Sequence, residues 1–202
     1  MLPWPLCRSL RAGLRVSPDA PCVFAPENAR AVSYNCTRPC VVNMRHAAQL
    51  LLTHGTRVLL CRHAAGPFAG RYTGIFAHAL PGEPPRDAAL RGAAALGLLM
   101  PPHALHLRAV FLFAESDDGD AGPCEEHQYV AAASNEHLTA PHPTAEVEPT
   151  WWEQSALPFE RMPADDALWY GRVLAGELLR GSFRFNGRDM ISADVRAVDA
   201  LP

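Results

Sequence analysis

The sequence predicts an α/β domain over residues 41–202 that follows an extension of residues 1–40. Short apolar runs bounded by turn residues indicate strands on both sides of an alanine-rich helical segment, and such alternation is typical of α/β folds. Hydrophobic residues make up 49% of the 202-residue chain and charged residues 19%. This composition is sufficient for a hydrophobic core and excludes a disordered chain.

The charge composition limits the classes of partner. The chain has 18 basic and 21 acidic residues, a formal net charge of −3, and every basic residue is arginine. This balance excludes a strongly basic nucleic-acid binder, so no DNA-binding patch is expected. No apolar run approaches the ~18–20 residues of a membrane-spanning helix, so no membrane partner is expected. The lack of lysine indicates either the codon bias of a GC-rich genome or selection against lysine.

The extension of residues 1–40 differs from the rest of the chain. It contains prolines and four of the six cysteines, without the periodicity of a helix or strand. Its first 18 residues contain arginines and no acidic residue, since Asp19 is the first acid. Such a stretch weakly resembles a mitochondrial transit peptide. We expect a cytoplasmic protein with a flexible extension, or a mitochondrial one if the extension is a transit peptide. In either compartment the cysteines are expected to be free thiols.

The first predicted strands follow the extension directly. Residues 49–53 and 57–61 predict two strands joined by a tight turn at His54-Gly55. Residues 72–80 predict a third strand.

A proline-rich loop and a helix come next. Residues 81–85 indicate a loop, and Pro84 or Pro85 suits the first turn of a helix. Residues 86–96 contain good helix formers and predict that helix. Gly97 is then placed to end it.

The second half of the chain predicts further strands around an acidic loop. The loop, residues 116–122, is interpreted as a solvated hairpin tip because it lacks the spacing of an EF-hand calcium loop. The predicted elements are strands over 105–113, 128–133 and 150–153, a helix over 165–179, and a hairpin of 182–185 and 190–195 around Asn186-Gly187-Arg188-Asp189.

A series of motifs narrows this α/β class. Those of residues 45–200 are Arg57-Val58-Leu59-Leu60, Ala69-Gly70-Arg71-Tyr72-Thr73-Gly74, Pro81-Gly82-Glu83, Arg91, Gly97-Leu98, Leu157-Pro158-Phe159, Met162, Asp165-Asp166, Trp169-Tyr170, Gly181-Ser182-Phe183-Arg184-Phe185, Asp189 and Val195-Arg196-Ala197-Val198-Asp199. Their order resembles the Nudix hydrolases, and among them the eukaryotic MutT homologues, which hydrolyse oxidised purine nucleoside triphosphates. The resemblance implies an α/β/α sandwich with a mixed sheet between helices.

The Nudix box, the catalytic motif of this family, is degenerate here. The family pattern is G-x5-E-x7-R-E-U-x-E-E-x-G-U, where U is an aliphatic residue. The matching remnants are Glu83, Arg91 and Gly97. The other glutamate positions of the pattern fall on Gly92, Ala95 and Leu96, and one residue is missing before Gly97.

Loss of these carboxylates removes the oxygen ligands that a catalytic Mg²⁺ requires. Glu83 and Asp87 are at most a weak metal site, so no cofactor is expected and Mg²⁺ only with residual activity. Arg91 has lost its family partner on the helix, and its side chain faces either solvent or another acid.

The resemblance also implies a purine-binding pocket. In the family, adjacent acids bind the purine edge and aromatic residues enclose the ring. The candidate base-binding residues are Thr73, Phe111, Phe113, Asp165, Asp166 and Trp169. Each has an alternative interpretation: the acids suit the start of a helix, and the aromatic residues suit a hydrophobic core.

Three functions remain open. The first is a pseudoenzyme that lost hydrolysis and kept a nucleotide-binding or scaffolding role. The second is a weak or altered nucleoside triphosphate diphosphohydrolase that uses Glu83, Asp87 and loop acids such as Glu125, Glu126 or Glu146. The third is a protein-interaction module without a nucleotide role. The partners expected are accordingly a purine nucleotide or nucleoside, or another protein.

Overall fold

The computed structural model describes residues 44–115, 122–138 and 141–202. The predictions for the extension of residues 1–40 and for residues 116–121 of the acidic loop lie outside the described residues. In the described part of the chain, no helix is long and apolar enough to cross a membrane.

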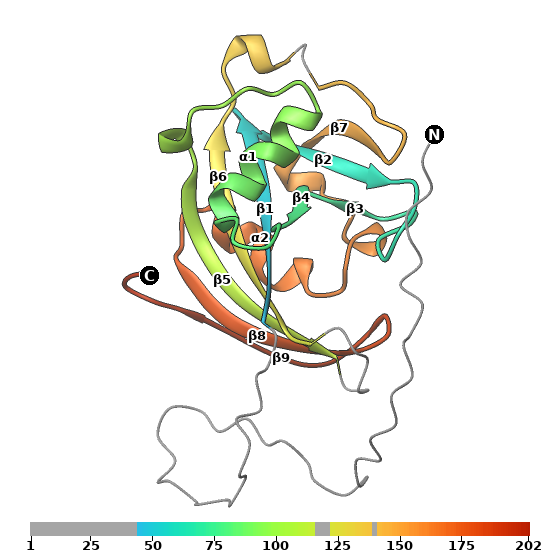
Figure 1. The fold of residues 1–202 in the computed structure, drawn as a ribbon, viewed down its shortest axis with the longest axis vertical. Helices are drawn as coiled ribbons and strands as arrows, with labels where there is room; N and C mark the ends of the chain where they lie inside the picture. The colour runs from blue at the N-terminus through green and yellow to red at the C-terminus, as the bar shows by residue number, and fades with distance from the viewer. Residues whose placement is uncertain (1–43, 116–121, 139–140) are drawn as a thin grey trace, which may run out of the picture. The chain divides into compact units, whose positions relative to one another are not determined.

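The described residues form nine strands and two α-helices, with short 3-10 helices between them (Figure 1). The helix after Pro84, the final hairpin and the predicted strands other than 72–80 are confirmed. The single strand predicted over 72–80 is wrong: Gly74 divides it into two short strands, which pair with different partners. The elements are β1 (Arg45–His54), β2 (Arg57–His63), β3 (Tyr72–Thr73), β4 (Ile75–His78), α1 (Pro85–Ala95), β5 (His106–Glu115), β6 (Cys124–Ala132), β7 (Val147–Glu153), α2 (Asp166–Leu174), β8 (Leu179–Asn186) and β9 (Asp189–Ala197).

Two predicted boundaries are wrong. The helix predicted over 165–179 ends at Leu174, because Gly176 adopts a φ of +94° and Leu179 begins β8, where it pairs with Ala109. The strand predicted from residue 128 begins at Cys124, because β6 pairs with β1 along its whole length.

The strands of the described residues form one mixed sheet in the order β3-β2-β1-β6-β5-β8-β9, with β4 paired to β1 and β7 to β2. The pairs β1–β6 and β5–β8 are parallel, and the other pairs are antiparallel. Along one edge, β1 pairs with β4 from Ala47 to Leu50 and with β2 at Thr53 and His54. This edge of β1 is therefore divided between two strands.

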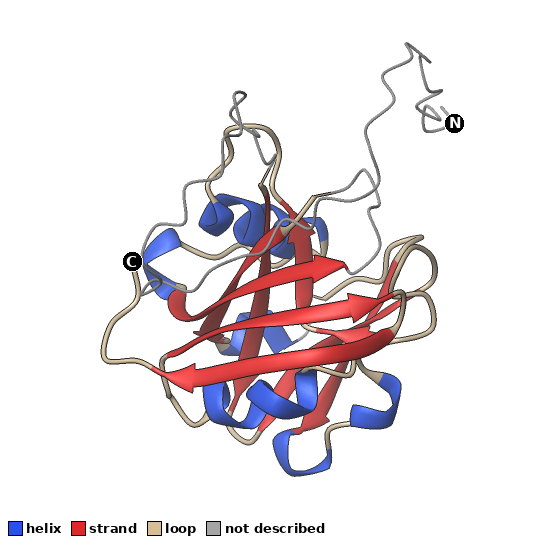
Figure 2. Cartoon of the chain, turned by 90° about the horizontal axis from the view of Figure 1, so that it is seen from below, coloured by secondary structure: helices blue, strands red, loops and turns tan. Residues whose placement is uncertain are grey.

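Helices cover both faces of the sheet (Figure 2). Successive side chains of a strand point to opposite faces, so Leu50 of β1 packs with three alanines of α1 (Ala88, Ala89 and Ala93), whereas Leu51 packs with Trp169 of α2. All of these residues are buried. The α/β/α sandwich with a mixed sheet between helices is confirmed.

Candidate functional site

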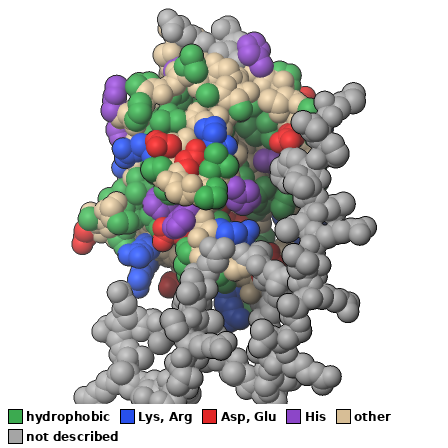
Figure 3. Space-filling view, viewed as in Figure 1, with side chains coloured by type: hydrophobic (Ala, Val, Ile, Leu, Met, Phe, Trp, Pro, Cys, Tyr) green, Lys and Arg blue, Asp and Glu red, His purple; other side chains and the backbone are tan. Residues whose placement is uncertain are grey.

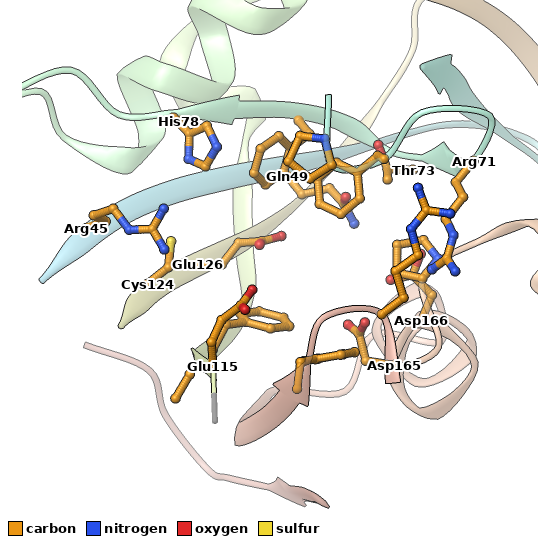
Figure 4. A pocket seen from close by; sticks show the side chains of 18 of the residues that line it. Arg45, Gln49, Arg71, Thr73, His78, Glu115, Cys124, Glu126, Asp165 and Asp166 are labelled. Atoms are coloured by element: carbon orange, nitrogen blue, oxygen red, sulfur yellow. The ribbon is translucent and has the colours of Figure 1, made fainter. Parts of the chain in front are cut away.

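A cavity of about 250 Å³ opens on the α2 side of the sheet (Figure 4). Its lining comes from β1, β3, β4, β5 and β6, from the start of α2, from the loops before β3, β6 and α2, and from the β8–β9 hairpin. The polar lining residues are Arg45, Gln49, Arg71, Thr73, His78, Glu115, Cys124, Glu126, Asp165, Asp166 and Arg188.

Asp165 and Asp166 lie in this cavity, as predicted from the sequence, and they are only 4% and 3% exposed. Asp165 stands at the N-cap of α2, but its side chain makes no capping hydrogen bond. Its Oδ2 instead accepts a hydrogen bond of 3.1 Å from the indole Nε1 of Trp169. Helix capping therefore does not account for the acid pair.

The second acid of the pair has an unpartnered oxygen. Asp166 Oδ2 is buried and has no hydrogen-bond partner in the described structure. Buried polar atoms are almost always paired in folded proteins, because leaving one unpaired costs about 1–3 kcal/mol. This carboxyl oxygen is therefore free to accept or donate a hydrogen bond at the cavity.

Glu126 of β6 and Glu115 of β5 bring the carboxyl groups of the cavity lining to four. Gln128 Nε2 donates a hydrogen bond of 2.7 Å to Glu126 Oε1 and holds the carboxyl in place. Figure 4 shows the carboxyl groups of Glu126 and Asp165 directed toward the open centre of the cavity. From the sequence, Glu126 was expected only as a loop acid. The alternation of Cys124, Glu126 and Gln128 would have placed it on one face of a strand, had the start of β6 been recognised.

The pKa values of Asp165, Asp166 and Glu126 are raised. Burial raises the pKa of Asp166 well above its ordinary value, and the charges of Asp165 and Glu126 raise it further, against the effect of Arg71. Burial also raises the pKa of Asp165, opposed by its hydrogen bond from Trp169. For Glu126, burial raises the pKa to about 8, opposed by the Gln128 hydrogen bond and assisted by Asp165. A protonated carboxyl donates a hydrogen bond, so the cavity offers both donors and acceptors.

Among the predicted aromatic residues, only Phe113 lines the cavity. The expectation that Phe111 and Trp169 line it is wrong. Both are buried in the core beneath it, with ring centroids 5.4 Å apart. They lie there because their strand and helix positions point between α2 and the sheet. The aromatic lining is Phe68, Phe76, Phe113 and Phe185.

Thr73 lies at the cavity, but its hydroxyl is bonded within the protein. Thr73 Oγ1 donates to the carbonyl of Gly74 at 2.8 Å and lies 2.8 Å from His63 Nε2. Burial lowers the pKa of His63, which favours the neutral ring. A neutral ring with its proton on Nε2 donates a hydrogen bond to Thr73 Oγ1. Both hydrogen bonds of this hydroxyl are therefore made within the protein, and they fix the cavity wall.

Two remnants of the Nudix box, Glu83 and Arg91, are hydrogen-bonded to each other. Arg91 donates from Nε to Glu83 Oε1 at 2.9 Å and from a terminal nitrogen to Oε2 at 2.8 Å. The amide of Leu80 donates to Oε2 at 2.7 Å, and Arg91 also donates to the carbonyl of His78. These bonds to Arg91 and Leu80 lower the pKa of Glu83 to about 2. Of the two alternatives left open for Arg91, solvent or an acid other than its family partner, the structure shows the acid, Glu83.

The three substituted box positions have different surroundings. A Cβ added at Gly92 would lie 3.3 Å from Ala77 Cβ, so the helix packs closely on β4 there. Leu96 is 2% exposed in the core, whereas Ala95 is exposed to solvent. The face of the molecule that carries α1 intersperses basic, acidic and hydrophobic side chains (Figure 3).

The residues present do not fit the Mg²⁺ that the fold family implies. Both oxygens of Glu83 already accept hydrogen bonds, Asp87 is exposed, and positions 92, 95 and 96 have no side-chain oxygen. Within the described ranges, no three His, Cys, Asp or Glu residues form a group that could hold a metal ion. We derive no metal-dependent step from this helix.

Comparisons with known proteins give one short sequence match and several structural ones. No family model matches the chain. A segment of 51 residues is 37% identical to the oxidized purine nucleoside triphosphate hydrolase of Danio rerio. This match covers 25% of the chain and spans 33% of the length of that relative.

Among solved structures, the MutT protein of Bacillus halodurans superposes with a TM-score of 0.61 at 16% identity. The match covers 75% of this chain and 97% of that one. A NUDIX hydrolase of Nitrosomonas europaea gives a TM-score of 0.48 at 14% identity, over 70% of this chain and 78% of that one. At such identities the likeness to the MutT protein is a likeness of fold.

Proposed function

We propose that this protein, which has the fold of the Nudix hydrolases, binds a purine nucleotide or nucleoside through its base and has lost metal-dependent diphosphate hydrolysis. In this proposal it acts as a nucleotide-binding or scaffolding pseudoenzyme.

The unpartnered oxygen of Asp166 supports base binding more directly than any other observation. It lies in a cavity with aromatic and other apolar side chains and a few convergent polar groups, which is the usual composition of a small-molecule site. The edge of a purine presents ring nitrogens and exocyclic groups that pair with carboxyl donors and acceptors. Phe68, Phe76, Phe113 and Phe185 supply apolar contacts for the ring.

The pairing of Glu83 with Arg91 supports the loss of hydrolysis. A carboxylate with three hydrogen bonds and a pKa of about 2 is held by the arginine and is a poor candidate to recruit a metal ion. The remaining box positions offer no replacement oxygen. We expect no Mg²⁺-dependent turnover of purine or oxidised purine nucleoside triphosphates; turnover near ordinary enzyme rates, roughly 1–1000 per second, contradicts this part of the proposal.

Isothermal titration calorimetry of the full chain with adenine and guanine nucleosides tests base binding. We expect binding that is independent of Mg²⁺ and that persists without the phosphates, because the acids contact the base. Asp166→Ala is expected to weaken it by about 0.5–1.5 kcal/mol, the usual net value of a hydrogen bond between neutral groups.

Asp194→Ala, a change at an exposed position of β9, is the matched control and should leave the affinity unchanged. Alanine is preferred to asparagine at position 166 because asparagine keeps a donor that a protonated aspartate also provides. Absence of binding by every base contradicts the proposal and favours the protein-interaction module.

A further inference from the structure

The last strand of the sheet, β9, leaves one edge without a pairing strand among the described residues. We propose that two copies of this chain associate through β9 as an antiparallel pair centred on Val195, in which Asp194 of each copy faces Arg196 of the other. The sheet of one copy then continues into the sheet of the other. This surface lies outside the cavity, so the proposal does not depend on base binding.

The free edge of β9 is open to a partner. β9 is the outermost strand of the sheet, and within the described ranges it pairs only with β8 (Figure 1). From Ser192 to Ala197 every residue is exposed except Val195, which is half-buried. An edge strand presents its outward N–H and C=O groups to any strand that can pair with it. β9 therefore offers an extended backbone surface.

The β8–β9 pairing identifies the backbone groups at this edge. The register shifts next to Ile191, so the regular part of β9 begins at Ser192. The amide of Val198 donates to the carbonyl of Leu178 at 2.9 Å, so the backbone groups of Val198 point toward β8. Residues that bond to one neighbouring strand alternate with residues that do not. The outward groups therefore belong to Ala193, Val195 and Ala197.

An antiparallel pair of two β9 strands centred on Val195 uses all of these outward groups. Val195 then pairs with Val195 of the second copy, and Ala193 pairs with Ala197 of the second copy, as hydrogen-bonded pairs. Asp194 and Arg196 form the intervening non-hydrogen-bonded pairs, in which opposite side chains lie closest. The centre of the pair thus coincides with the regular part of the strand.

The charges of β9 match a second copy better than they match β8. Arg196 lies directly opposite Arg180 of β8, and Asp194 lies opposite Ser182. Within the described ranges, no ion pair of 4.0 Å or less involves Arg180, Asp194 or Arg196. Like charges directly opposite each other are unfavourable, whereas opposite charges stabilise a strand pair. Centring the pair on Val195 places an aspartate opposite an arginine twice across the interface.

This charge order favours a second copy over an unrelated strand. Charged side chains on an edge strand usually prevent pairing with another edge. In β9, however, two charges of opposite sign stand two residues apart, and an antiparallel copy reverses their order. Asp194-Val195-Arg196 is therefore its own complement. Asp194 lies on the face of Ser182, whereas Phe183 points to the α2 side, where the cavity opens. The pairing leaves both cavities open.

Analytical ultracentrifugation of the full chain at increasing concentrations, up to about 1 mM, tests the pairing. We expect a reversible dimer of the wild-type protein. Arg196→Asp and Asp194→Arg each place like charges opposite one another, so each should weaken the dimer by about tenfold or more. An equimolar mixture of the two variants should restore it, because each aspartate of one chain then faces an arginine of the other. Arg184→Asp, at an exposed position of β8, is the matched control and should leave the dimer unchanged.

Each outcome decides the proposal. A monomer at every concentration overturns it. A dimer that neither substitution weakens forms through another surface and overturns the role of β9, and a mixture that does not restore the dimer overturns the pairing centred on Val195. Amide hydrogen exchange of the wild-type protein gives a second measurement that holds even if a variant does not fold. The amides of Ala193, Val195 and Ala197 should exchange more slowly at high protein concentration, and exchange that does not change with concentration contradicts the pairing.

Discussion

At the scale of single residues, the hydroxyl of Tyr170 holds α2 to the strands beside the cavity. It accepts hydrogen bonds from the amide of Gly74 at 2.7 Å and from Gln49 Nε2 at 3.2 Å. The ring is fully buried, and the lining residues Gln49 and Thr73 are adjacent to these contacts. One hydroxyl therefore fixes both the helix and part of the cavity wall.

Tyr170→Phe is predicted to destabilise the protein by about 1–3 kcal/mol, because it leaves the buried Gly74 amide without an acceptor. Urea unfolding measures the change in the free energy of unfolding. Tyr72→Phe is the control, since the Tyr72 ring packs on Trp152 elsewhere in the same core. An equal effect of the two substitutions would argue against the role given to the Tyr170 hydroxyl.

The sequence predicted part of the site at this scale. Asp165 and Asp166 could be found because adjacent acids at this place in the chain match the base-binding acids of the family that the sequence resembles. Phe111 and Trp169 could not be distinguished from core residues, because the pattern of a strand or helix gives the face of a residue but not what covers it. Glu126 was missed because β6 pairs in parallel with β1, a contact distant in sequence.

At the scale of elements, α1 depends on small side chains for its packing. Ala88, Ala89 and Ala93 are fully buried against the sheet, and Leu96 ends the same face. A box glutamate at position 96 would have to enter this core, whereas one at position 95 would reach solvent. The box therefore cannot be restored simply by returning glutamates to these positions.

Leu96→Glu is predicted to lower the free energy of unfolding by several kcal/mol, about 3 or more, because it removes a buried leucine and buries a carboxyl. Ala95→Glu should change it by less than about 0.5 kcal/mol, as exposed substitutions do. Chemical denaturation of the two single variants checks the difference. Tolerance of glutamate at both positions would contradict the placement of the helix face.

The β8–β9 pair contains a close backbone approach at Gly181. A Cβ added there would collide with the carbonyl oxygen of Asp194 on the partner strand. Gly181→Ala is therefore predicted to separate the strands locally and to speed amide hydrogen exchange of β9. Gly171→Ala, where nothing lies within 4 Å of the added Cβ, is the control and should not affect β9.

Local patterns predicted most elements, and tertiary pairing decided the rest. Pro84 and Pro85 correctly located the start of α1, because proline suits the first turn of a helix. The apolar residues from Leu174 to Leu179 continue a helical spacing, which is why the second helix was predicted too long. Leu179 is a strand residue only because Ala109 of β5 pairs with it.

At the scale of the whole molecule, the buried acids make stability depend on pH. The pKa of Glu126 is 4.5 when unperturbed and about 8 in the folded protein, and the pKa values of Asp165 and Asp166 are also raised. An acid with a raised folded pKa stabilises the fold fully below its unfolded pKa. That contribution is lost as pH rises toward the folded value.

We predict that the free energy of unfolding decreases between about pH 5 and pH 8, by up to roughly 1.4 kcal/mol per pH unit for each acid that stays neutral. Below about pH 6.5, the lowered pKa values of the half-buried His63 and of His78 act in the opposite direction. Glu126→Gln should flatten the decrease from pH 5 to 8, and urea unfolding across this range measures it. A slope that is identical in the variant would rule out a neutral Glu126.

The parallel pairing of β5 with β8 also determines when the cavity is complete during synthesis of the chain. Phe185 and Arg188 belong to the final hairpin, yet they line a cavity whose other residues begin at Arg45. While β8 is still in the ribosome, the edge of β5 has no pairing strand and the cavity is incomplete. Contacts this distant in sequence also form slowly. The base binding proposed above therefore requires the β8–β9 hairpin, because a chain without this hairpin lacks part of the cavity lining.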